Sequence, residues 1–189
     1  MGFRRSGPHI YRPHCEACQA CIPCRLPVAT FKPTRQQQRA LKRNADLRVA
    51  ELDDINNPAI YALYERYINE RHKDGDMYPP SQEQFETFLT QAWGRTHFFG
   101  MHSDDRLIGV AVVDELDNAF SAVYTFFAPD EHKRSLGNFA ILWQIEEARR
   151  RNLPYVYLGY WIKNCRKMNY KSQYRPLEVL INDHWLTLT

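Results

Sequence analysis

The sequence has no long hydrophobic run, and nowhere does it approach the roughly 20 consecutive apolar residues that a transmembrane helix needs. No apolar stretch follows the basic residues near the N-terminus, so we expect no secretory signal peptide. Cysteine is absent outside residues 15–24 except at Cys165, a distribution that does not suit a disulfide framework. These absences predict a protein without a membrane partner, in a reducing compartment, and we expect it in the cytoplasm.

A chain of 189 residues, 44% of them hydrophobic, can bury the core of one ordinary domain with an extension. Its net charge of +3 is unevenly divided. The first 50 residues hold 10 Lys+Arg and 2 Asp+Glu, a net +8, whereas the other 139 hold 15 and 20, a net −5. Cations such as Arg4 and Arg5 alternate with Phe3, Tyr11 and Phe31, a mixture that suits phosphate contact and base stacking. A polyanion partner is therefore expected, and a solvated basic face is the alternative.

Four cysteines recur at every third position, at Cys15, Cys18, Cys21 and Cys24. Thiolates at this spacing can converge on one cation, because the intervening turn residues let the backbone fold around it. The spacing is closer to the start of a ferredoxin-type cluster run than to a zinc ribbon. We predict these four as ligands of a zinc ion or an iron–sulfur centre, completed by His14 or a more distant group. Free structural thiols are the alternative.

Hydrophobic periodicity and turn residues predict alternating strands and helices after a Pro- and Cys-rich start. Ser81 and Gln84 have the spacing of a capping box. The helix between two strands after an antiparallel meander implies a parallel pair, hence a mixed sheet with a ligand cleft where that pair separates. The expected elements are extended pieces over residues 1–33, helix Arg35–Asn44, strand Leu47–Leu52, a helix from Pro58, a helix from Ser81 to Trp93, strands Thr96–His102, Leu107–Leu116 and Phe120–Phe127, a helix from Ser135 to Arg151, strand Tyr155–Tyr160, helix Lys163–Tyr170, and strands Leu177–Ile181 and His184–Leu188.

Several motifs are similar to those of one protein family. They are Tyr11-Arg12-Pro13-His14-Cys15-x-x-Cys18-x-x-Cys21, Phe127-Ala128-Pro129-Asp130 with Ser135-Leu136-Gly137, Tyr157-Leu158-Gly159-Tyr160-Trp161-Ile162, and Met168-Asn169-Tyr170-Lys171 with Tyr174-x-Pro176-x-Glu178. Together they cover nearly the whole chain and resemble the aminoacyl-tRNA–protein transferases, most closely their bacterial aspartate/glutamate leucyltransferase branch.

The resemblance implies an α+β fold with a mixed sheet like that of N-acetyltransferases (GNAT) and helices on both faces, over residues 47–189. Residues 1–46 would be a Cys-rich, basic remnant of an N-terminal domain. The implied activity is transfer of leucine from charged tRNA to the N-terminal Asp or Glu of proteins, marking them for N-degron degradation. The alternatives are an arginyl-tRNA–protein transferase and an inactive RNA-binding remnant.

Two departures from related patterns matter. Family members carry residues ahead of Gly2, one of them a cysteine, so we expect this chain to be shortened and its metal site incomplete unless Cys24 substitutes. Acyl-CoA enzymes of this fold end their pyrophosphate loop on a small residue, where this chain has the bulky Phe139. Coenzyme A is therefore not expected as a donor, and transfer from an activated ester needs no cofactor.

The amides at the start of the helix after Ser135 are candidate donors to a tetrahedral oxyanion, although Gly137 is equally explained by a tight turn. Arg134 could reach terminal nucleotides, or be an exposed loop charge. Tyr170 and Tyr174 would orient groups through their hydroxyls, or belong to the core. The predicted catalytic residues are Arg134, Leu136, Gly137, Asn138, Tyr170 and Tyr174.

An acceptor with an acidic side chain requires a nearby cation. We predict Lys171 or Arg175 in this role, with surface charges as the alternative and Arg134 or Arg71 as the next candidates. Charged tRNA would bind the basic first segment through Arg35, Arg39, Lys42 and Arg43.

Overall fold

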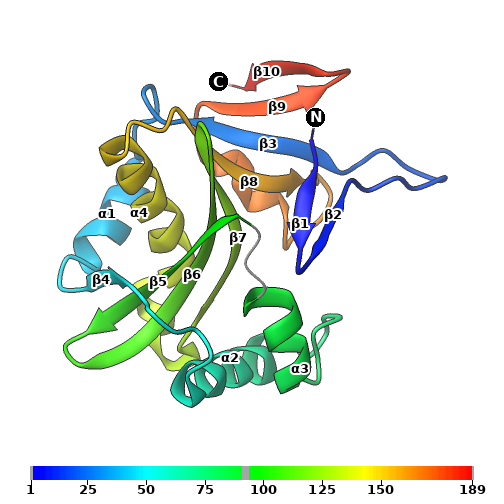
Figure 1. Ribbon diagram of the computed structural model, residues 1–189. Coiled ribbons are helices and arrows are strands. Elements are labelled where there is room, and N and C mark those ends of the chain that lie inside the picture. The colour runs from blue at the N-terminus through cyan, green and yellow to red at the C-terminus, as the bar shows by residue number, and fades with distance from the viewer. Residues whose placement is uncertain (1, 91–93, 189) are drawn as a thin grey trace.

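The computed structural model describes residues 2–90 and 94–188. It has a two-stranded β1-β2 hairpin and an eight-stranded mixed sheet in the order β10-β9-β3-β8-β7-β6-β5-β4 (Figure 1). The strands are β1 Arg4–Ser6, β2 His9–Tyr11, β3 Ile22–Pro27, β4 Arg48–Glu51, β5 Arg95–Ser103, β6 Arg106–Leu116, β7 Ala119–Phe127, β8 Tyr155–Trp161, β9 Leu177–Ile181 and β10 His184–Leu188. The helical elements are α1 Arg35–Arg43, α2 Pro58–Arg71, α3 Gln82–Phe85, a π-helical turn η1 Glu86–Thr90, the 3₁₀ helices η2 Pro129–Arg134 and η3 Asn169–Gln173, and α4 Leu136–Arg150.

Helices cover both faces of the sheet. On one face, Trp143 of α4 packs on Phe99 of β5, with ring centroids 4.7 Å apart. On the other, Tyr64 of α2 packs on Phe126 of β7 at 5.6 Å. Phe99 aligns through β6 with Thr125, whose neighbour Phe126 points the opposite way because side chains alternate along a strand. The predicted mixed sheet with helices on both faces is confirmed.

The helices begin where local capping chemistry predicts. At the start of α1, the Thr34 side chain accepts from the Gln37 amide at 3.3 Å and the Gln37 side chain accepts from the Thr34 amide at 2.8 Å. Asn57 caps α2 ahead of Pro58. The Ser81 hydroxyl accepts from the Gln84 amide at 3.1 Å and opens α3. The Gln84 side chain accepts from the Tyr64 hydroxyl at 3.2 Å, so only the first bond of the predicted capping box is present. The three caps thus fix three helix starts from a few neighbouring residues.

Strands β5, β6 and β7 form the predicted antiparallel meander, and β8 pairs with β7 in parallel. The two last strands match their predicted limits. The helix predicted over Lys163–Tyr170 is wrong. That segment has consecutive turns, such as Cys165 N to Ile162 O at 3.2 Å, before η3. It carries too few apolar residues at helical spacing to define a buried face. The helix predicted from Ser81 is present as α3 and η1 up to Thr90, and its predicted end at Trp93 lies outside the described residues.

The first segment differs most from expectation. Its strand β3 lies inside the large sheet, hydrogen-bonded to both β8 and β9, and α1 packs against α4. Because of Pro23 and Pro27, the sequence does not indicate this strand. The side chains of Cys24 and Leu26, two residues apart, nevertheless both lie in the core and are fully buried. Residues 22–43 therefore share the sheet and core of residues 47–189, whereas the sequence predicts a separate remnant ending at residue 46. Within the described residues, no helix is long and apolar enough to cross a membrane.

Candidate functional site

The predicted separation of the parallel pair is present. Strands β7 and β8 pair only over three residues, from Ala119 opposite Tyr155 to Ser121 opposite Tyr157. Beyond that point the backbone carbonyls facing the gap have lost their ladder partners. A bulge in the β6–β7 register lies at the same place, since Val112 aligns with Tyr124 but Val113 with Ala122. The gap opens beside the start of α4, where a ligand cleft is expected in a parallel pair.

The guanidinium of Arg4 lies in this gap and bonds to both strands. Its Nη2 donates to the carbonyls of Ala122 at 3.1 Å and Val123 at 2.6 Å, and its Nη1 donates to Leu158 O on β8 at 3.3 Å. Gly159 makes room for it, because a Cβ there would lie 1.4 Å from Arg4 Nη1. From the sequence, Arg4 is expected only to be solvated or to bind phosphate. Nothing local in the sequence indicates that it inserts into the sheet.

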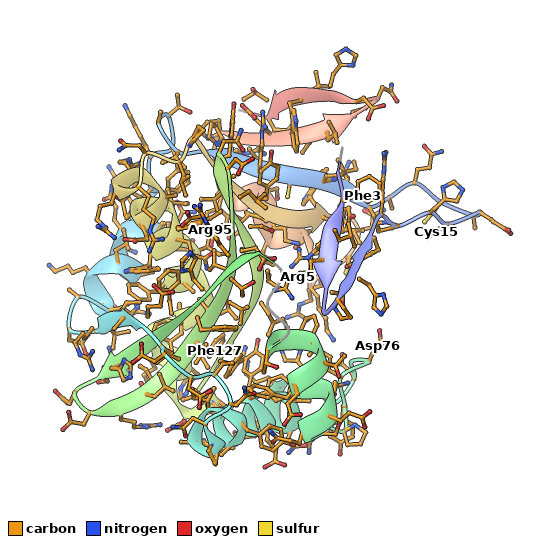
Figure 2. All side chains as sticks on the ribbon, in the orientation of Figure 1. Phe3, Arg5, Cys15, Asp76, Arg95 and Phe127 are labelled. Atoms are coloured by element: carbon orange, nitrogen blue, oxygen red, sulfur yellow. The ribbon has the colours of Figure 1, made fainter. Side chains whose placement is uncertain are left out.

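Arg5 is likewise not a surface cation. Its Nε and Nη2 bind the two carboxylate oxygens of Asp114 at 2.7 and 2.9 Å, and both side chains are buried. Thr96 donates to the same carboxylate at 2.7 Å. Figure 2 shows Arg5 between the N-terminal hairpin and the sheet. The expectation that Arg5 contributes to a polyanion-binding face is corrected, because its charge is neutralised in the interior.

Helix α4 begins after Ser135, which has left-handed backbone angles of φ 56° and ψ 47°. The amides of Leu136 and Gly137 open the helix, where backbone N–H groups have no intrahelical partner. The Asn138 amide donates to Ser135 O at 3.0 Å, so it is already engaged. A Cβ on Gly137 would lie 3.3 Å from the Phe127 ring, which shows that the glycine also allows β7 to end close against the helix. Figure 2 marks Phe127 at this end of the strand.

The two predicted tyrosines differ in exposure. Tyr174 is 2% exposed, stacks on Phe31 and donates from its hydroxyl to Asn138 Oδ1 at 2.5 Å. Burial raises the pKa of Tyr174, so the hydroxyl keeps its proton and stays a donor. Tyr170 is 39% exposed as a residue, but burial of its hydroxyl raises its pKa. The structure thus brings Tyr174 and Asn138 together at the start of α4.

Lys171 is 3% exposed, and its Nζ donates to Tyr160 O at 2.5 Å and contacts Met168 Sδ at 3.5 Å. Desolvation lowers the pKa of Lys171 to about 8, although the nearby Cys24 thiol raises it. Arg175, the other predicted acceptor contact, is exposed. The two predicted acceptor cations therefore lie in opposite environments.

Arg134 is bound by two acidic residues. It forms a bidentate pair with Asp46 at 2.9 Å for both contacts, and its Nε donates to Glu131 at 3.0 Å. The Arg134 carbonyl accepts from the Asn44 side chain at 2.8 Å, which fixes the end of α1 beside the start of α4. Near its other end, the Gln37 side chain donates to Gln173 O at 3.3 Å. Helix α1 thus runs along the site, with Arg35, Arg39, Lys42 and Arg43 exposed on it.

The cysteines do not form the predicted set of four. Cys24 is fully buried on β3 and burial raises its pKa to about 11, which disfavours the thiolate that a metal needs. Cys15 and Cys18 are exposed on a loop that projects from the body (Figure 2). Burial raises the pKa of Cys21, and the neighbouring thiols of Cys15, Cys18 and Cys165 add to this. In residues 2–90 and 94–188, no group of three or more His, Cys, Asp or Glu side chains is placed to hold a metal ion. The described residues therefore give no support to the predicted metal centre.

Comparison with solved structures shows the fold. The C-terminal domain of a putative lysylphosphatidylglycerol synthetase from Agrobacterium fabrum matches with a TM-score of 0.55 at 12% identity, over 76% of this chain and 47% of that one. A glucosamine N-acetyltransferase region related to GCN5, from a fungal multi-domain enzyme, matches with a TM-score of 0.50 at 10% identity, over 74% and 18%. The GNAT-like fold class is confirmed.

Comparison of sequences gives the family. A family model described as the N terminus of arginine-tRNA-protein transferase matches residues 1–39, and one described as its C terminus matches residues 59–181. Curated proteins named aspartate/glutamate leucyltransferase are 60% identical in Pseudomonas entomophila and 61% in Pseudomonas putida. Each alignment covers 100% of this chain and 80% of the relative. The chain therefore belongs to the arginine-tRNA-protein transferase family, as its motifs indicated.

Proposed function

We propose that the protein transfers leucine from charged tRNA to the N-terminal Asp or Glu of other proteins. The observation that carries this proposal is the identity of about 60%, over the whole chain, to relatives named aspartate/glutamate leucyltransferase. The strand gap beside the α4 N-terminus supports it, because this is where the fold can bring two substrates together.

In the proposed reaction, the free α-amine of the acceptor attacks the ester carbon of leucyl-tRNA. A C–N bond forms, the C–O bond to the terminal ribose breaks, and the ribose oxygen takes up a proton while the amine loses one. The ester is already activated, so positioning supplies much of the rate. A free α-amino group has a pKa near 7.7–8.0, so water suffices to take its proton. The reaction as proposed requires no cofactor and no coenzyme A.

We assign stabilisation of the tetrahedral oxyanion to the start of α4. The amides of Leu136 and Gly137 point from a helix N-terminus, whose dipole favours developing negative charge. Tyr174 and Asn138 are assigned to holding this turn through their mutual hydrogen bond, and the exposed Tyr170 to contacting substrate. Because Asp46 and Glu131 occupy Arg134, we assign it to positioning the loop ahead of α4 rather than to binding nucleotides.

Leucine transfer is tested with labelled leucyl-tRNA and arginyl-tRNA on peptides that begin with Asp, Glu or Lys. We expect label from leucyl-tRNA on the acidic peptides only. Label from arginyl-tRNA alone would instead support an arginyltransferase, which the name of the family model favours. An absence of transfer from both donors, with charged tRNA still bound, would indicate an RNA-binding protein without turnover.

We propose that charged tRNA binds along α1. We also propose that the protein acts in the cytoplasm, where charged tRNA is available. Replacing Arg35, Arg39, Lys42 and Arg43 with Ala should weaken tRNA binding, because each phosphate contact releases counterions. The slope of log affinity against log salt concentration should flatten by up to about three to four. Arg95→Ala, an exposed cation on β5, is the control and should change the slope by less than about one. An unchanged slope in the fourfold variant would show that α1 is only a solvated face.

A further inference from the structure

Most buried or half-buried cations of this protein have a carboxylate partner. Arg5 binds Asp114 at 2.7 Å, Arg25 binds Glu178 at 2.6 Å, and Arg151 binds Glu115 at 2.7 Å. These pairs follow the rule that a charge removed from water needs an opposite charge or strong hydrogen bonds nearby.

Arg4 and Lys171 are exceptions that lie next to each other. Arg4 binds three backbone carbonyls, and Lys171 binds one carbonyl and a methionine sulfur. Across residues 2–90 and 94–188, neither forms an ion pair with a carboxylate. Two of their acceptors, Leu158 O for Arg4 and Tyr160 O for Lys171, lie two residues apart on β8, and the charge of Arg4 helps to lower the pKa of Lys171. In the part of the chain that the structure describes, the two positive charges thus lie near each other without a carboxylate partner.

We propose that Arg4, with Lys171 behind it, forms the subsite for the side-chain carboxylate of the acceptor's N-terminal residue. This inference rests on the proposed function. Lys171 is almost fully buried, so it acts through its charge, whereas the partly exposed Arg4 makes the contact. An arginine has five N–H donors, and Arg4 uses three on carbonyls through Nη1 and Nη2. The remaining Nε–H and Nη1–H point apart, so Arg4 can offer one donor to a given external anion.

The position of Tyr170 connects this subsite to the start of α4. Tyr170 is 39% exposed, and its pKa is raised by burial of the hydroxyl and lowered by the charge of Arg4. Tyr170 also helps to raise the pKa of Tyr174, which bonds to Asn138 on α4. Tyr170 therefore lies near both the cation pair and the tyrosine that bonds to the helix start.

A carboxylate fits this pair better than a tRNA phosphate does. The Arg4 guanidinium is held between two strands by carbonyls on both sides, so it can offer only one donor to a compact anion. Helix α1 presents its four cations in the open, where a phosphate backbone can reach them. We therefore assign the buried pair to the acceptor and the exposed helix to tRNA.

The test measures binding of matched peptides to the full chain, without turnover. One pair of peptides begins with Glu or Gln and a second with Asp or Asn, so the members of each pair differ only in the side-chain carboxylate. We expect the wild-type protein to prefer the acidic member. In Arg4→Gln, affinity for the acidic peptides should fall by about ten- to a hundredfold, while affinity for the neutral ones stays unchanged. Arg12→Gln, an exposed cation just after the same hairpin, is the control and should keep the preference.

Several outcomes would overturn the assignment. If Arg4 only held the strands in place, Arg4→Gln would lower the affinities for acidic and neutral peptides equally. The ratio of the two affinities would then stay unchanged. A loss of charged-tRNA affinity with an unchanged peptide ratio would assign the pair to a phosphate. Where Arg4→Gln fails to show a cooperative thermal transition, Arg4→Lys and Lys171→Met replace it, and an intact acidic preference in both would contradict the proposal. A wild-type protein that prefers acidic peptides but transfers no leucine would contradict only the proposed function.

Discussion

Replacing Asp114 with Asn is expected to lower the free energy of unfolding by about 3–5 kcal/mol, the cost of leaving the partner of a buried ion pair uncompensated. The change keeps the shape of the side chain but removes the charge that Arg5 and Thr96 contact. Asp114 lies on β6 and Arg5 on β1, so the pair attaches the N-terminal hairpin to the sheet. Urea denaturation followed by circular dichroism measures the effect.

Two further variants separate charge burial from hairpin attachment. Asp46→Asn removes the partner of Arg134, but Asp46 is 52% exposed, so the loss should stay below about 1 kcal/mol. The double variant Arg5→Met, Asp114→Leu replaces both charges with apolar side chains and should recover most of the stability. If Asp114→Asn were as stable as the wild type, the buried pair would be contradicted.

Gly159→Ala is expected to expel Arg4 from the strand gap. Gly159 has a φ of +78°, where a side chain costs about 1–2 kcal/mol, and its added Cβ would lie 1.4 Å from Arg4 Nη1. The guanidinium is the flexible partner, so it should move and lose its contacts with Ala122, Val123 and Leu158. The variant should therefore lose stability and also lose the preference for acidic acceptor peptides, as Arg4→Gln does.

Gly94→Ala is the matched control. Gly94 has a similar φ of +74°, but a Cβ there would meet no atom within 4 Å among the described residues. It carries the backbone strain without the clash, so it should lose about 1–2 kcal/mol and keep the acidic preference. Equal peptide preference in the two variants would show that Arg4 does not depend on Gly159 for its place.

The location of the gap between the parallel strands followed from element order, but its contents did not. A helix between two strands after a meander requires a parallel pair, and the gap in that pair is present at β7 and β8. The residues that fill it come from far along the chain, since Arg4 bonds to carbonyls 118, 119 and 154 positions away. No periodicity or spacing records a contact of that kind.

The sequence by itself determined the helix starts, the central strands and the family. Caps such as Thr34 with Gln37 act over three residues, strand alternation acts over two, and the motifs are continuous in the chain, so each is complete in a short window. Only the tertiary structure decided that β3 joins the large sheet, that Cys24 enters the core and that Arg5 pairs with Asp114. The physical reason is that burial and charge pairing depend on which distant segments meet. The sequence alone does not distinguish a cation that is solvated from one that contacts a phosphate or a buried carboxylate.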